Sequence, residues 1–231
     1  MDGTVSAHST NNSFYLIDSL NKYSGADSLF ITGGHLYYVG RANKKDFAVA
    51  LQNDSTIVFY QRVNATWDAT DTLRSAEGGF GFHGVSVKDL NGDNRGDVII
   101  AHDLIGSAGN TVNFVFLFDD RRNEFVHNQY YDLGNVRYIS KSKLVGSSWF
   151  AGILHSQEKM TYKITGDSLT FNEGVTLFAL ETMAPDDTIG TLEFYKMKGE
   201  KRIVTKRIHA DIDKLWDVFD KTYWDGEMED D

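Results

Sequence analysis

The sequence predicts an all-β protein with a propeller-like arrangement of four to five small antiparallel blades. Three observations indicate this fold class. The chain of 231 residues contains 15 Phe and 11 Tyr but a single Pro, a composition that favours strands over disorder. Short aromatic and β-branched runs alternate with polar turns. Pairs of these runs recur about every 51 residues, which is close to the period of propeller blades.

Four segments each join two strands through a short loop, and further strands follow each pair. The first strands begin at His35, Gly84, Tyr138 and Leu192, and the second strands begin at Asp46, Asp97, Phe150 and Arg202. Third strands are predicted over 56–60, 113–118, 160–164 and 215–219, and fourth strands over 66–70, 124–127 and 168–171. Four short antiparallel strands per unit are typical of a propeller blade.

Three parts of this interpretation have alternatives. Residues 13–18 and 29–32 look like two further strands that could complete a closing blade. Short strands at regular spacing also occur in a β-sandwich, which is the alternative fold. Residues 211–220 could form a short helix instead of a strand, because Ile212, Leu215, Trp216 and Phe219 fall at helical spacing.

The length and the charge of the chain indicate its domain organisation and its expected partners. We expect a flexible segment over 1–12, a single β domain over 13–226 and an acidic tail over 227–231. The net charge of −10 indicates an acidic surface that no basic cluster interrupts, which makes nucleic acid an unexpected partner and a basic protein an expected one. No apolar run reaches the roughly 18 residues of a membrane span. The chain has no Cys, so cysteine usage says nothing about its compartment.

One loop carries a pattern of metal ligands. Between the first two strands of the second unit lies Asp89-Leu-Asn-Gly-Asp-Asn-Arg-Gly-Asp97, with oxygen-bearing side chains at its positions 1, 3, 5 and 9. A tightly curled loop turns alternate residues inward, and calcium prefers six to eight oxygen ligands. The predicted calcium ligands are Asp89, Asn91, Asp93, the backbone carbonyl of Arg95, and Asp97.

Other interpretations of this loop fit less well. An EF-hand is excluded because its twelfth position, normally a bidentate Glu, is Ile100 here. Magnesium binds fewer carboxylates, and transition metals prefer imidazole or thiolate ligands. The segment could also be a plain polar turn, since Asn and Gly are common there. Three carboxylates within nine residues repel one another in a folded loop, and a bound cation removes this repulsion. Folding and binding should therefore be coupled, and we expect a structural calcium ion rather than a catalytic one.

The loop and its surroundings resemble a known family. Asp89 to Asp97 lies between Gly79-Phe-Gly-Phe-His-Gly and an apolar strand, and resembles the calcium loops of FG-GAP and VCBS-type propeller repeats. The segment from Val87 to Phe125 is similar to a group of bacterial exported propeller-like proteins that includes a periplasmic lysozyme inhibitor. The resemblance implies a non-enzymatic, calcium-stabilised protein-binding module in the periplasm or at the cell surface, whose signal peptide is absent from this chain.

Two further function classes stay open. The four Trp residues, at 67, 149, 216 and 224, could form sugar-stacking platforms of a carbohydrate-binding module, although aromatic residues of β proteins mostly pack in cores. Among 33 acidic residues, some close pair could serve a polysaccharide-active enzyme. We expect no enzymatic activity, because the scattered His residues and the absence of a nucleophile elbow or phosphate-binding loop favour neither hydrolase nor nucleotide chemistry.

Overall fold

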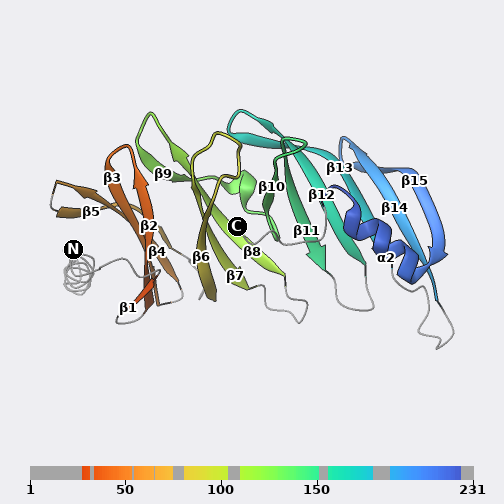
Figure 1. Cartoon of the computed structure of the whole chain (residues 1–231), viewed down its shortest axis with the longest axis horizontal. Helices are drawn as coiled ribbons and strands as arrows, with labels where there is room; N and C mark the ends of the chain where they lie inside the picture. The colour runs from red at the N-terminus through yellow and green to blue at the C-terminus, as the bar shows by residue number, and fades with distance from the viewer. Residues whose placement is uncertain are drawn as a thin grey trace, which may run out of the picture.

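The computed structural model shows three antiparallel sheets standing in a row (Figure 1). It describes residues 28–31, 34–53, 55–64, 66–74, 81–103, 110–150, 156–178 and 188–224. Nearly all of the described elements are strands of these sheets, so the all-β class is confirmed. The predicted segments 1–12, 13–18 and 227–231 lie outside the described residues.

The first sheet, sheet A, has five strands in sequence order. They are β1 (Ser28–Ile31), β2 (Gly34–Ala42), β3 (Lys45–Gln52), β4 (Thr56–Val63) and β5 (Thr66–Arg74). β4 is rich in aromatic and β-branched residues, and both β3 and β4 are buried on both faces in the middle of the sheet. The predicted strand near Leu29 pairs with β2 and extends this sheet.

The second sheet, sheet B, carries the predicted metal loop and has four strands in sequence order. They are β6 (Phe82–Lys88), β7 (Asp97–Asp103), β8 (Thr111–Asp119) and β9 (Glu124–His127). A short 3₁₀ helix, η1 (Gln129–Tyr131), follows β9. All four strands predicted for the second repeat unit are present, because their apolar runs are short and separated by strong turn sequences.

The third sheet, sheet C, has six strands in sequence order. They are β10 (Arg137–Ile139), β11 (Leu144–Phe150), β12 (Gln157–Thr165), β13 (Ser168–Phe178), β14 (Ile189–Lys198) and β15 (Lys201–Asp211). The chain then enters helix α2 (Ile212–Lys221), whose N-terminus is capped by the Asp211 side chain. The helical alternative for residues 211–220 is thus confirmed, and the strand over 215–219 was wrong.

Sheet C corrects two further predictions. The strand predicted to begin at Phe150 ends there instead, because Arg137–Ile139 turns back at residues 140–143 and pairs directly with Leu144–Gly146. The third and fourth repeat units do not form separate blades. β13 is long enough for its second half, Gly174–Phe178, to pair with β14, and this pairing joins both units in one sheet.

Hydrophobic side chains fill the spaces between the sheets. Sheets A and B enclose a core that includes Phe47, Phe59, Phe116 and Phe125. A second core, with Leu90, Ile99, Val115, Tyr131 and Val145, joins sheet B to sheet C. Open antiparallel sheets that pack face to face are the arrangement of a β-sandwich, and the described strands close no ring.

Helix α2 covers part of the other face of sheet C (Figure 1). Leu215 and Phe219 are buried against Val175, Leu177 and Leu192. The side chain of Lys159 on β12 is also buried here, and its Nζ donates hydrogen bonds to the carbonyl oxygens of Phe219 and Asp220, each at 2.9 Å. These carbonyls belong to the helix C-terminus, where a cation is favoured.

Candidate metal centre

The predicted metal loop is the hairpin connection between β6 and β7. Lys88 pairs with Asp97, so the two strands close at the base of the loop. Gly92 and Asn94 have positive φ values of 78° and 65°, which curl the backbone between them. The spacing of turn residues within the sequence therefore produces the tight loop that was expected.

The polar side chains of the loop bind its own backbone. The two Asp89 carboxylate oxygens accept the N–H groups of Gly92 at 2.6 Å and Asn94 at 2.8 Å. The amide oxygen of Asn91 accepts the N–H of Asp93 at 3.0 Å, and Oδ1 of Asp93 accepts the N–H of Arg95 at 2.8 Å. Alternate side chains thus fold over the loop.

Asp97 is the buried member of the set. Its side chain is fully buried, and its two oxygens accept the N–H groups of Leu90 at 2.9 Å and Phe118 at 3.1 Å. Burial raises the pKa of Asp97 to about 7, and the charges of Asp93 and Asp89 act in the same direction, whereas the two N–H groups oppose the rise. The three carboxylates therefore interact electrostatically across the loop.

The Arg95 guanidinium pairs with a carboxylate outside this set. Its Nη2 lies 3.1 Å from the Asp120 carboxylate in the loop after β8. The side chain therefore neutralises Asp120 rather than the loop carboxylates, and the backbone carbonyl of Arg95 is the group that the ligand pattern uses.

Two tyrosines that the sequence did not single out lie beside the loop. The Tyr131 side chain is fully buried, and its hydroxyl has no hydrogen-bond partner among the described residues. Burial raises the pKa of Tyr131 to about 12, and Asp97, Asp167 and Asp93 contribute to the rise. The hydroxyl of Tyr138, on β10, sits so close to Gly92 that a Cβ there would lie 2.2 Å from it. No pattern in the sequence of the loop indicates that Tyr131 and Tyr138 lie beside it.

The residues present match calcium in chemistry more than in arrangement. All five predicted donors are oxygens, and each carboxylate oxygen that accepts one N–H keeps a free lone pair. A buried hydroxyl without a partner also lies within electrostatic range of two of the carboxylates. Within the described ranges, however, no three carboxylate or imidazole side chains gather into a metal-binding group. Ligation would therefore require the loop side chains to turn inward.

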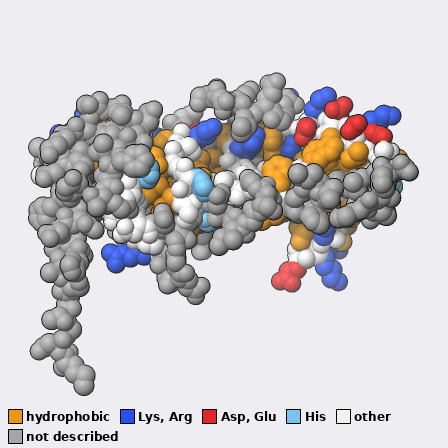
Figure 2. All heavy atoms as spheres, turned by 90° about the horizontal axis from the view of Figure 1, so that it is seen from below, with side chains coloured by type: hydrophobic (Ala, Val, Ile, Leu, Met, Phe, Trp, Pro, Cys, Tyr) orange, Lys and Arg blue, Asp and Glu red, His pale blue; other side chains and the backbone are white. Residues whose placement is uncertain are grey.

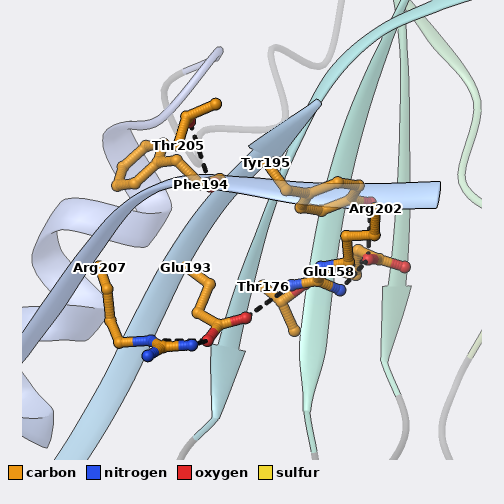
Figure 3. A network of polar contacts seen from close by, with 8 residues as sticks. All are labelled: Glu158, Thr176, Glu193, Phe194, Tyr195, Arg202, Thr205 and Arg207. Atoms are coloured by element: carbon orange, nitrogen blue, oxygen red, sulfur yellow. Dashed lines mark hydrogen bonds and ion pairs between the residues drawn. The ribbon is translucent and has the colours of Figure 1, made fainter. Parts of the chain in front are cut away.

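A second polar cluster spans sheet C (Figure 3). Glu158, Thr176, Glu193 and Arg207 lie opposite one another on four successive strands, β12 to β15. Arg202 donates to Thr176 at 2.9 Å and Glu193 at 3.2 Å, and its guanidinium lies 3.5 Å from Glu158.

The carboxylates of this cluster are already engaged. Glu158 also accepts the Tyr195 hydroxyl at 2.7 Å, and Nε of Arg207 donates to Glu193 at 2.7 Å. The guanidinium of Arg202 stacks 3.9 Å from the centre of the Tyr195 ring. Both acidic side chains thus take part in a cross-strand network that links β12 to β15.

Three of the four tryptophans take part in separate contacts. Trp67 is buried in a core on sheet A together with Leu36 and Tyr60. Trp216 packs with the buried residues of α2. Trp224 lies over the charged groups of Lys159 and Arg137, at 4.9 and 5.1 Å from its ring centre. For Trp67 the expected core role is confirmed.

The prediction that no basic cluster interrupts the acidic background was wrong. Between residues 196 and 207, on β14 and β15, six residues are Lys or Arg and one is Glu. The overall net charge of −10 concealed this segment, because net charge averages over the chain. Figure 2 shows charged side chains of both signs around exposed hydrophobic ones at the sheet C end of the molecule.

No protein-family model matches this chain, and no curated protein matches its sequence. One similar solved structure is described as a Xanthomonas type IV secretion system related protein. It is 15% identical to this chain, with a TM-score of 0.45, over 78% of this chain and 92% of that chain.

The described part of the chain contains no helix that is long and apolar enough to span a membrane.

Proposed function

We propose that this chain is a non-enzymatic protein-binding domain, exported from the cell, in which the loop from Asp89 to Asp97 binds a structural calcium ion. The observation that carries the proposal is the position of Asp97. It is a fully buried carboxylate whose pKa is raised mainly by burial, with a smaller contribution from Asp93 and Asp89 in the same loop. A buried negative charge that also feels two like charges is costly unless a cation neutralises it.

The ion would be held by oxygen ligands alone. Asp89, Asn91, Asp93 and Asp97 would contribute side-chain oxygens, and Arg95 its backbone carbonyl. Bound calcium supplies positive charge that offsets the repulsion between the carboxylates. The unpartnered Tyr131 hydroxyl, which is near Asp97 and Asp93, supports the presence of a further polar group in this region.

A structural role follows from the position of the loop between two sheets. Leu90 belongs to the core that joins sheets B and C, and Asp97 fastens the loop to β8 through the Phe118 N–H. Gly92 contacts Tyr138 at the first strand of sheet C. Calcium would therefore stabilise the sheet B and sheet C contact, and the stacked sheets would act as blades of a propeller-like arc.

Protein binding is supported by the charge of the chain and by the family resemblance. With a net charge of −10, the chain attracts basic proteins over long range. Lysozyme is a basic protein and is therefore the first partner to test, by titration of its hydrolytic activity at low and high salt. The network of Glu158 and Glu193 supports the proposal of a non-enzymatic role. The oxygens of these two carboxylates already interact with Arg202, Arg207 and Tyr195.

Thermal unfolding of calcium-stripped protein, with and without millimolar calcium, tests the metal site. At a concentration about 100 times the Kd, calcium adds about 2.7 kcal/mol, which corresponds to a Tm rise of roughly 5 to 10 °C. Asp93→Ala should abolish the rise. Asp68→Ala, which removes an exposed carboxylate from β5, should preserve it and serves as the matched control. Equal shifts in all three proteins would contradict calcium binding at this loop.

A further inference from the structure

Strand β15 is the outermost described strand of sheet C. It runs over 11 residues and is hydrogen-bonded to β14 on one side only, among the residues that the structure describes. Residues 201–207 are all exposed. An exposed edge of this length presents a row of backbone N–H and C=O groups to which another extended chain can pair.

The strand register places four lysines on one face of the β14–β15 hairpin. Lys198 pairs with Lys201, and Lys196 pairs with Ile203. The register shifts between Phe194 and Tyr195, and Phe194 pairs with Lys206. Because directly opposed residues and alternate residues of a strand share a face, these side chains lie together. We call Lys196, Lys198, Lys201 and Lys206 the lysine face.

No described carboxylate compensates the charge of the lysine face. None of its four side chains forms an ion pair with a described carboxylate. On the opposite face of the hairpin, by contrast, Arg202 and Arg207 are paired with Glu158 and Glu193 (Figure 3). Strong local positive charge in a chain of net charge −10 is a departure that favours an acidic partner at this place.

An apolar residue lies within the lysine face. Ile203 is 46% exposed, and its cross-strand partner is Lys196. The same face of sheet C is covered further along by α2, against whose core Phe194 and Ile208 pack. Beyond the helix, residues 196–198 and 201–207 are exposed in the described part of the chain, and this end of the face presents one apolar side chain among the lysines. A bound segment would therefore be acidic with at least one apolar side chain.

We propose that the β15 edge and the lysine face bind an acidic, extended segment of a partner protein, which adds to sheet C as a further strand. This inference rests on the protein-binding role proposed above and adds a surface for an acidic segment, distinct from the basic proteins that the net charge of −10 attracts. Backbone hydrogen bonds along β15 hold the segment, and its carboxylates meet the lysines. Lysines on an edge strand also oppose pairing between two copies of the chain, because like charges then face each other. The lysine face thus selects an acidic strand and rejects its own copy.

Fluorescence anisotropy with a labelled peptide tests this proposal. The probe is a peptide of about nine residues in which Glu alternates with Val, a length and pattern suited to a strand. We expect saturable binding that weakens with salt. The double variant K201E/K206E should lose about tenfold or more in affinity. The matched control K141E/K143E makes the same charge change at the exposed β10–β11 turn and should stay within about twofold of the wild type.

Two further probes separate strand addition from plain charge attraction. A peptide of the same length and charge, in which Pro replaces two central Val residues, cannot pair along an edge and should bind at least about tenfold more weakly. An oligonucleotide of equal charge should bind more weakly than the strand-forming peptide. Equal binding of all three probes, equal effects of the two double variants, or no binding to the wild type would each overturn the proposal.

The variants can be checked for folding, and the two proposals can fail separately. K201E/K206E changes exposed side chains only, and an unchanged Tm confirms that it remains folded; if its Tm falls, K201A/K206A replaces it with the same expected direction of effect. Peptide binding is measured with and without calcium. Loss of the calcium-dependent Tm shift would count against the metal site alone, whereas failure of the peptide to bind in a calcium-shifted protein would count against the lysine face alone.

Discussion

The carboxylate of Asp97 and the backbone N–H of Phe118 form a hydrogen bond of 3.1 Å across the buried interior of sheet B. This bond ties the first residue of β7 to the end of β8, and the second oxygen of Asp97 holds Leu90 at the start of the loop. A single buried side chain therefore fixes both ends of the candidate metal loop. Its charge state should influence the stability of the whole sheet.

The pH dependence of stability should carry the signature of Asp97. Its folded pKa of about 7 exceeds the ordinary value near 4, so the calcium-free folded protein binds this proton more tightly than the unfolded chain does. Stability from this group is present below about pH 4 and is lost as pH rises towards 7, by up to about 4 kcal/mol. This sign is opposite to that of most carboxylates.

Urea unfolding of metal-free protein between about pH 4 and 7.5 measures this effect. Asp97→Asn, which cannot titrate, should lack the decline, and the comparison of slopes removes the contributions of other groups. Saturating calcium should flatten the decline in the wild type, because it stabilises the ionised carboxylate. An identical slope in the wild type and Asp97→Asn would show that Asp97 does not titrate in this range.

Gly92→Ala should destabilise the protein by about 2 to 4 kcal/mol. The residue has a φ of +78°, and an added Cβ would lie 2.2 Å from the Tyr138 hydroxyl. Gly199→Ala is a matched control, because Gly199 has a φ of +62° with no atom within 4 Å of the added Cβ. It should cost only the backbone strain, about 1 kcal/mol. Chemical denaturation compares the two, and equal losses would mean that the loop does not press against β10.

Lys159→Met should loosen helix α2. The substitution leaves the carbonyls of Phe219 and Asp220 without their charged donor at a buried helix end, at a cost of about 2 to 4 kcal/mol. Lys163→Met on the same strand replaces an exposed lysine and should change stability by less than about 0.5 kcal/mol. Amide hydrogen exchange should show faster opening of α2 only in the Lys159 variant. Unchanged exchange there would assign the docking of α2 to its apolar face alone.

The accuracy of the sequence-based predictions followed how local each signal was. All four strands of the second repeat unit were predicted, because their turns and apolar runs lie within a few residues of each other. The strand predicted to begin at Phe150 was misplaced, since β11 begins after the turn that follows Ile139 and ends at Phe150. The sequence alone allowed either a helix or a strand at α2. The structure shows a helix, whose apolar side chains pack against Leu177 and Leu192.

The candidate site was likewise predictable only where its residues are close together in the sequence. The curled loop of Asp89 to Asp97 could be predicted, because glycine and alternating oxygen donors act over nine neighbouring residues. Tyr131 and Tyr138 could not, because they reach the loop from elements about 40 residues further along the chain. The predictions of calcium binding and of the partner await the experiments above.

By itself the sequence determined the β class, most strand positions and the one loop rich in carboxylates, because backbone propensity, turn chemistry and side-chain alternation act between near neighbours. Only the tertiary structure decided how the units were grouped, that Asp97 is buried against Phe118, and that four lysines gather on the open face of one hairpin. Those features depend on which strands pair and which faces become covered. Such contacts join distant parts of the chain, and their free energy appears only when the sheets are packed together.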